Sequence, residues 1–219
     1  MADEAGNMKL STQAPPALPL ATDEYNVQYQ NGLIRILRLY FNTLFNFSAA
    51  LVGSIGAGYL KTPSGQFSSR VSQSAAAADT PKRVAFEITD FANEVYGVIG
   101  DGVHVNHPGV YNYQFSIQFE NPTAQYVEVT VWLKVNGVDV PYTSSKYAIS
   151  VKHGTIDGFL IMTCNFFLSM AAGDYVELWW ATTDVLAAIA AYPAQTVPYA
   201  CPGIPSAVAT LSFVSCLME

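Results

Sequence analysis

Two histidines spaced three residues apart are the first side chains in the sequence that suggest metal chemistry. His104 and His107 form an H-x-x-H pattern, and Asp101 lies just before it. Histidine and carboxylate ligands suit zinc, at a loop or around a three-fold axis. In an extended strand, however, residues i and i+3 point to opposite faces. No cysteine or acidic residue lies at ligand spacing to complete the set, so we expect no metal and no other cofactor.

The other short motifs indicate turns rather than catalysis. The glycine-rich run from Gly53 to Gly58 follows a helical pattern, and no lysine or helix start comes after it, as a phosphate-binding loop would require. His153-Gly154 and Gly173-Asp174 are typical of turns, where Asp hydrogen-bonds its own backbone. There is no G-x-S-x-G motif, and the few acidic residues do not cluster as glycosidase carboxylates do. We therefore expect a protein that is not an enzyme.

The composition favours a chain that buries surface against copies of itself. Apolar residues make up 51% of the 219 residues and charged residues only 12%, against about 25% in a typical soluble domain. The net charge of −7 argues against nucleic-acid binding, which needs a basic face. The three cysteines, Cys164, Cys201 and Cys216, are an odd number with irregular spacing, which favours reduced thiols over a disulfide framework.

The N-terminal sequence lacks the basic and apolar regions of a signal peptide. No run of about 18 apolar residues is present. We expect a protein made in the cytoplasm, not secreted by a signal peptide and not inserted in a membrane.

The first part of the chain divides into an arm, a helix and a linker. Residues 1–24 are polar and proline-rich and are expected to form an extended arm. Residues 25–47 are expected to form a helix that self-associates or anchors, and 48–64 have a linker composition. The alternative is an amphipathic helix packed on its own domain. The helix prediction depends on a 4-3-4-3 spacing typical of a heptad seam, formed by Leu33, Leu37, Tyr40, Leu44 and Phe47.

From residue 65 to 219 the apolar period changes to two, which predicts strands. Apolar residues alternate with polar ones along 111–119 and 127–135, and Asn136-Gly137 between valines is a strong hairpin signal. Further strands are expected at 147–151, 159–168, 175–181, 185–191 and 206–217. Many short strands without a helix between them predict an all-β sandwich or barrel.

Several segments occur in an order that resembles a known family. They are Gly109–Ser116, Trp132–Pro141, His153-Gly154, Asn165–Leu168, Ala172–Trp179 and Ile204–Leu211, after an opening strand near Gly65–Gln73. Together they resemble the C1q/TNF-like jelly-roll domain of tailed-phage virion proteins, over about residues 65–217. The resemblance implies a β jelly roll that forms a homotrimer through one aromatic-rich sheet. The stretch Tyr192–Pro202 departs from the family pattern.

Aromatic residues lie on both faces of the predicted strands, so some must fill the core and others must be covered by a subunit interface. The candidates for these two roles are Tyr113, Phe115, Trp132, Trp179 and Trp180.

The resemblance implies a structural protein located in the virion. We expect a trimeric capsid decoration, head fibre or tail-fibre knob that binds other virion proteins, of the capsid or tail, through residues 1–47. The alternative is a host-receptor or glycan-binding adhesion module of a phage tail, with loop aromatics such as Tyr192 and Tyr199 stacking on sugars.

Overall fold

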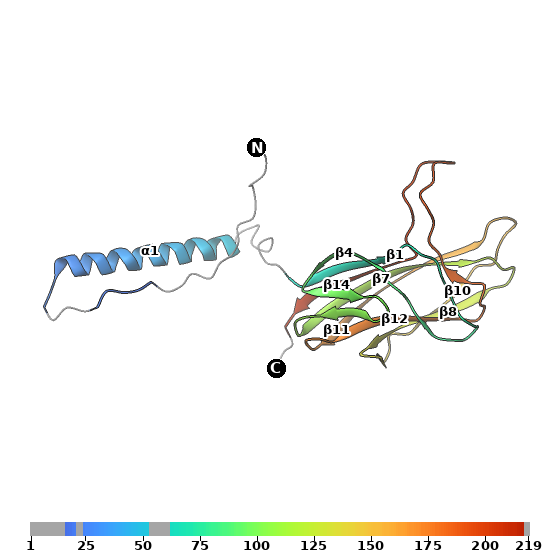
Figure 1. Cartoon of the computed structure of the whole chain (residues 1–219), viewed down its shortest axis with the longest axis horizontal. Coiled ribbons are helices and arrows are strands. Elements are labelled where there is room, and N and C mark those ends of the chain that lie inside the picture. Colours follow the sequence, from blue (N-terminus) through green and yellow to red (C-terminus); the bar gives the residue numbers. More distant parts are fainter. Residues whose placement is uncertain (1–15, 21–23, 53–61, 217–219) are drawn as a thin grey trace. The chain divides into compact units, whose positions relative to one another are not determined.

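The computed structural model describes residues 16–20, 24–52 and 62–216 (Figure 1). The chain forms two compact units, residues 1–61 and 62–219, which are described separately. Most of the predicted arm, residues 1–15 and 21–23, and the linker residues 53–61 lie outside the described residues.

The first unit contains one helix, α1 (Val27–Val52). Asn26 caps its N-terminus, because its Oδ1 accepts hydrogen bonds from the backbone N–H groups of Gln28 (2.8 Å) and Tyr29 (3.1 Å). The helix continues past the predicted end at residue 47, so the linker prediction of 48–64 began too early. The reason is local: residues 48–52 read Ser-Ala-Ala-Leu-Val, which a helix tolerates, and the first glycine comes only at position 53.

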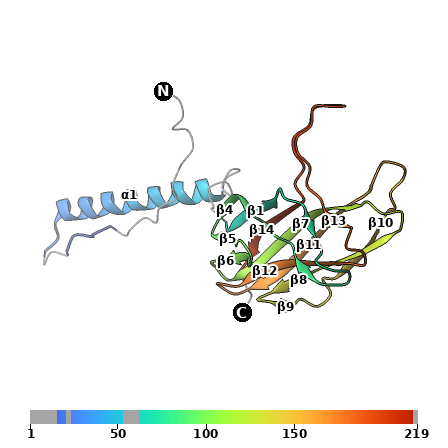
Figure 2. The same cartoon turned by 45° about the vertical axis from the view of Figure 1, so that its right-hand side comes forward.

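The second unit is an antiparallel β-sandwich, as the strand periodicity predicted (Figures 1 and 2). We name its two seven-stranded sheets after their long central strands, the β7 sheet and the β8 sheet. The β7 sheet contains β1 (Ser64–Ser69), β2 (Gln73–Ser74), β4 (Ile88–Asn93), β7 (Gly109–Asn121), β11 (Gly158–Met170), β13 (Ala188–Ile189) and β14 (Ala207–Ser215). The β8 sheet contains β3 (Lys82–Arg83), β5 (Val95–Val98), β6 (Gly102–Val105), β8 (Val127–Val135), β9 (Val138–Asp139), β10 (Ser145–Ile149) and β12 (Tyr175–Thr182).

Four antiparallel strand pairs are nested along the chain. The outermost pair joins β1 to β14, and the next joins β6 to β12. Inside these, β7 pairs with β11 and β8 pairs with β10. The first strand therefore lies beside the last one, and each later pair sits inside the previous pair in sequence.

The core lies between the two sheets and follows the predicted alternation. Tyr111, Tyr113, Phe115, Ile117 and Phe119 of β7 are all buried. Facing them from β8 are residues that are likewise buried, namely Val127, Val129, Val131 and Leu133. Each such side chain removed from water contributes about 1.5–3 kcal/mol, so these two strands provide much of the stability of the domain.

The turn chemistry also agrees with the sequence. Asn136 and Gly137 have φ angles of 52° and 76°, and they join β8 to β9 through the Val135–Val138 pair. Positive φ at both central residues is the conformation of a type I′ hairpin turn. One predicted strand is largely wrong, because 185–191 contributes only the two residues of β13. Its first half is a turn in which the backbone N–H of Leu186 donates to Asp184 Oδ1 at 2.9 Å.

Candidate functional site

The histidines of the H-x-x-H pattern have separate partners. The ring of His104 stacks on Tyr96 at 4.9 Å between centroids, and its Nε2 lies 3.0 Å from Asp101 Oδ2. His107 instead lies 3.3 Å from Glu94. Within the described part of the chain, no group of three His, Cys, Asp or Glu side chains is arranged to hold a metal ion. Nothing in this arrangement brings the two rings to a common ligand.

The two turn motifs are held by hydrogen bonds. His153 and Ile156 exchange two backbone hydrogen bonds around Gly154, whose φ is 62°. Asp174 accepts a hydrogen bond from the backbone N–H of Ala171 at 2.7 Å through Oδ2. Its Oδ1 accepts a second one from the Asn136 side chain at 2.8 Å. These hydrogen bonds stabilise the turns.

The predicted seam of α1 is partly exposed. Leu33, Leu37, Tyr40 and Phe47 are half-buried within their own unit, and Leu44 is 38% exposed. Other apolar side chains of the helix are also largely exposed, namely Val27, Ile34, Leu39, Phe41 and Phe45. The only charged residues of the helix are Arg35 and Arg38. A helix with this much exposed apolar surface suits a partner better than water.

The five aromatic candidates divide between the core and one outer face. Tyr113, Phe115 and Trp180 lie in the core, and the Trp180 ring packs on Phe119 at 5.8 Å. Burial raises the pKa of Tyr113 well above its usual range. Trp132 and Trp179 are paired across β8 and β12 on the outer face of the β8 sheet. Neither of these two tryptophans therefore contributes to the core.

The outer face of the β8 sheet is charged, and its charges pair with one another. Lys146 lies 2.6 Å from Glu128, and Lys134 lies 3.4 Å from Asp139 and 4.4 Å from the centre of the Trp179 ring. A third pair, Arg83 and Glu177 at 2.8 Å, joins β3 to β12. Across its seven strands the sheet has seven Lys, Arg, Asp and Glu residues, which are Lys82, Arg83, Glu128, Lys134, Asp139, Lys146 and Glu177. These paired charges surround Trp132 and Trp179 on the same outer face.

The outer face of the β7 sheet is different, because its seven strands contain no lysine or arginine and only two acidic residues, Asp90 and Glu120. Most of its outward side chains are small or uncharged. They include Gln66, Ser68, Asn112, Gln114, Ser116, Gln118, Val208, Thr210 and Ser212. A sheet face depleted of charge in this way is typical of a subunit contact.

Strand β11 forms an edge of this uncharged face. It pairs with β7 alone among the described strands, over all 13 residues. Its outward side includes Phe159, Ile161 and Phe167, which are 50%, 65% and 66% exposed. Long exposed edges in natural monomers carry charges or prolines that prevent pairing with other chains. Strand β11 has neither, so its edge is suited to contact with another chain.

An acidic pair that the sequence analysis missed lies at one end of the same face. The Glu120 carboxyl group lies close enough to Asp157 and to the Tyr192 hydroxyl for each to affect the pKa of the others. The Nζ of Lys152 lies 2.6 Å from Asp157 Oδ1. Two carboxylates therefore lie together in the fold, although no acidic cluster is visible in the sequence. Glu120 and Asp157 are 37 positions apart in the sequence, and only the β7–β11 pairing brings them together.

The surroundings shift the pKa values of the two carboxyl groups in opposite directions. Burial raises the pKa of Glu120, and the neighbouring Asp157 adds to this effect. The hydrogen bond from the Lys152 ammonium holds the pKa of Asp157 below its usual range. Burial, together with the Glu120 carboxylate, raises the pKa of Tyr192. The Tyr192 ring also contacts Phe159 edge to face, with centroids 6.2 Å apart.

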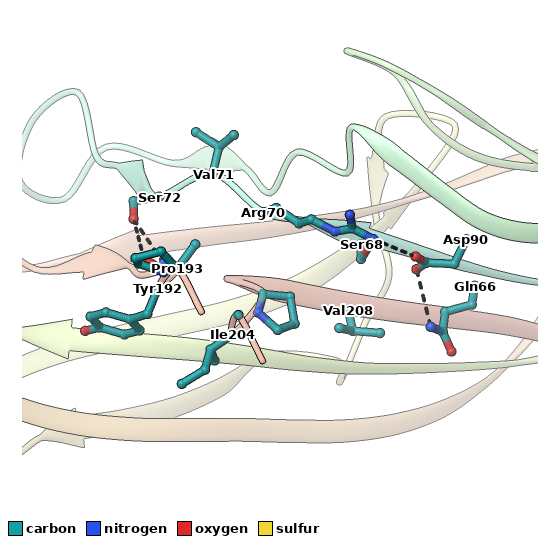
Figure 3. A pocket seen from close by; sticks show the side chains of 13 residues that line it. Gln66, Ser68, Arg70, Val71, Ser72, Asp90, Tyr192, Pro193, Ile204 and Val208 are labelled. Atoms are coloured by element: carbon teal, nitrogen blue, oxygen red, sulfur yellow. Dashed lines mark hydrogen bonds and ion pairs between the residues drawn. The ribbon is translucent and has the colours of Figure 1, made fainter. Parts of the chain in front are cut away.

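A groove of about 710 Å³ lies on the outer face of the β7 sheet (Figure 3). Outward residues of β1 and β14 line it, and so do both strands of the segment 191–205. Arg70 lies at one side, with its guanidinium 3.6 Å from Asp90. The hydroxyl of Ser68, which also lines the groove, is buried without a hydrogen-bond partner.

A comparison of the chain with protein-family models finds no match, and a comparison with curated protein sequences finds none either. In the described part of the chain, no helix is long and apolar enough to cross a membrane.

Proposed function

We propose that this chain is a structural subunit of a virus particle, a trimeric jelly roll attached to the particle through its N-terminal arm and helix. The observation that carries the proposal is the contrast between the two outer faces of the sandwich. One face has paired charges and suits water. The other has almost no charge, an unprotected edge strand and exposed aromatic side chains, and suits contact with copies of the same chain.

The nested strand pairs support the jelly roll. In this fold a long antiparallel ribbon is wrapped into two packed sheets, so that its first strand pairs with its last and its middle strands pair with each other. The pairs β1–β14, β6–β12, β7–β11 and β8–β10 have that order. The resemblance of the segments from Gly109 to Leu211 to C1q/TNF-like domains points to the same fold, and it implies a homotrimer.

A role without catalysis is part of the proposal. The carboxyl groups of Glu120 and Asp157 lie close enough to influence each other's pKa. Glycosidases need both of their carboxyl groups to face the substrate, one as an acid and the other as a base or nucleophile. Here the Nζ of Lys152 lies 2.6 Å from Asp157 Oδ1 and holds that carboxylate in an ion pair. This arrangement suits a structural contact better than glycoside hydrolysis.

Attachment to the particle is assigned to residues 1–47. In α1 the apolar side chains extend well beyond the predicted seam and remain largely exposed. A trimeric helix bundle buries only one stripe of each helix, which leaves apolar surface for a capsid or tail protein. Whether the subunit decorates the head or forms a fibre knob is decided by where labelled protein lies on intact particles in electron micrographs.

The second candidate function is a host-receptor or glycan-binding adhesion module. The groove beside Arg70 and Tyr192 favours it, because a charged pair and an aromatic ring line the same hollow. A glycan array with the purified protein tests this function. Tight binding to a defined sugar, together with no affinity for shells of the particle, would support the adhesion function and contradict the attachment function.

The mass of the protein in solution tests the assembly directly. Sedimentation equilibrium of the full chain at micromolar concentration is expected to give three times the chain mass of 23.7 kDa. A monomer under these conditions contradicts the proposal, because the uncharged face would then be stable in water.

A further inference from the structure

Residues 191–205 form an arm that extends away from the sandwich, as both views show (Figures 1 and 2). Two isolated bridges hold its strands together. Tyr192 pairs with Ile204, and Gln195 pairs with Cys201 through backbone hydrogen bonds of 3.0 and 3.1 Å. This is the stretch that departs from the family pattern, so its role does not follow from the resemblance.

The surface of the arm suits burial against protein. Residues 193–200 are all exposed, and Val197 and Tyr199 are 78% and 66% exposed. No charged residue occurs anywhere from 185 to 218. A two-stranded ribbon by itself is marginally stable in water, and exposed ribbons normally carry charges that keep them apart. The arm lacks such charges, so a partner surface is the natural means of stabilising it.

The position of the arm identifies that partner as a second copy of the chain. Its base stands on the outer face of the β7 sheet, where Tyr192, Pro193 and Ile204 form one wall of the groove and Ser68 and Val208 line it from the sheet (Figure 3). An arm that rises from a face must cross any contact formed on that face. If the β7 sheet is the subunit contact, the arm therefore reaches onto the neighbouring subunit.

The groove offers groups that match the tip of the arm. Its lining is mostly apolar, with Val71 and Pro193 among its residues. The Arg70 side chain is 67% exposed, which leaves its guanidinium accessible to an aromatic ring. The buried Ser68 hydroxyl lacks a hydrogen-bond partner, and a phenolic hydroxyl can both donate and accept. A tyrosine side chain meets all three requirements.

We propose that residues 191–205 are an exchange arm, and that Val197, Pro198 and Tyr199 at its tip occupy the groove of a neighbouring copy. The Tyr199 ring packs on Arg70 of that copy, and its hydroxyl pairs with Ser68. This inference rests on the proposed trimer. Each chain provides one arm and one groove, so the contact is heterologous and closes into a ring in a cyclic assembly.

Inter-chain disulfide formation tests the placement of the arm. The three native cysteines are replaced by alanine, and retention of the wild-type mass is checked by sedimentation. Val197→Cys is then combined with Val71→Cys in the groove. Oxidation is expected to give disulfide-linked trimers on a non-reducing gel. The matched control combines Val197→Cys with Val138→Cys, which is 70% exposed on the β8 sheet and is expected to give no linked trimers.

The trimer dissociation constant measures how much the tip of the arm contributes to assembly. Tyr199→Ser is expected to raise the trimer dissociation constant by about 10- to 100-fold, as loss of a central aromatic contact does. Tyr142→Ser, which removes an exposed tyrosine between β9 and β10, is expected to leave it unchanged. A wild-type trimer with equal affinity in both variants and no 197–71 cross-link overturns the arm proposal alone. A wild-type monomer overturns the proposed assembly itself.

Discussion

Replacing Phe167 by serine is the most direct probe of the uncharged face, because the side chain lies on the outward side of β11 without contributing to the core. Phe167 is 66% exposed in the single chain. An aromatic side chain buries roughly 200 Å² when fully covered, so about 130 Å² remains for a partner. At about 25 cal/mol per Å², covering it stabilises each contact by about 3 kcal/mol. We expect Phe167→Ser to weaken the trimer on the order of 100-fold per contact.

Sedimentation equilibrium over a range of protein concentrations measures this change. Urea unfolding of the same variant shows whether the sandwich itself is intact, and we expect little change there, since serine at an exposed strand position typically alters stability by about 0.5 kcal/mol or less. Tyr142→Ser removes a fully exposed aromatic side chain between two strands of the β8 sheet and serves as the control. Equal trimer affinity for wild type, Phe167→Ser and Tyr142→Ser would refute the assignment of the β7 sheet as the contact.

Two further predictions concern the helix and the acidic pair. Leu37→Asp combined with Leu44→Asp is expected to weaken trimer assembly or particle attachment while the unfolding of the β domain stays unchanged; a double variant that assembles and attaches normally would show that the seam is only internal packing. Glu120→Gln is expected to stabilise the fold at neutral pH, because the raised pKa of Glu120 means that its ionised form disfavours the native state. The advantage should shrink as the pH falls through that pKa and disappear below about pH 4, where the wild-type side chain is protonated in both states. Urea unfolding of both proteins across this range measures the difference, and a constant difference would contradict the burial of Glu120.

The strand pattern could be predicted because it depends on near neighbours in the sequence. The alternation through Tyr111 and Phe119 identifies the buried side of β7, and Asn136-Gly137 fixes a two-residue turn. These signals act within a few residues, where backbone geometry leaves few alternatives. The same local reasoning could not decide which of Trp132, Trp179 and Trp180 point inward, because adjacent tryptophans on one strand necessarily occupy opposite faces and either face can be apolar.

The candidate site could not be predicted, since it depends on contacts between distant segments. Glu120 alone is an ordinary outward residue of an alternating strand, and Asp157 alone is a loop residue. Their proximity follows from the register that pairs Glu120 with Phe159. The contrast between the two outer faces likewise requires knowing which strands share a sheet. The low charge content did indicate that some surface is covered, but it did not identify that surface.

The nested pairing of strands also sets the order in which the domain becomes complete during synthesis. The innermost pair, β8 and β10, is close in sequence and closes a short loop, whereas Ser64 of β1 pairs with Ser212 near the other end of the chain. Closing the long loop requires ordering nearly the whole domain first, which makes folding slow. Until β14 leaves the ribosome, one edge of β1 and one edge of β7 lack their pairing partner, and the nascent chain exposes strand edges that pair readily with other chains. Synthesis of β14 therefore completes both the β1 and the β7 edges of the sheet at the same step.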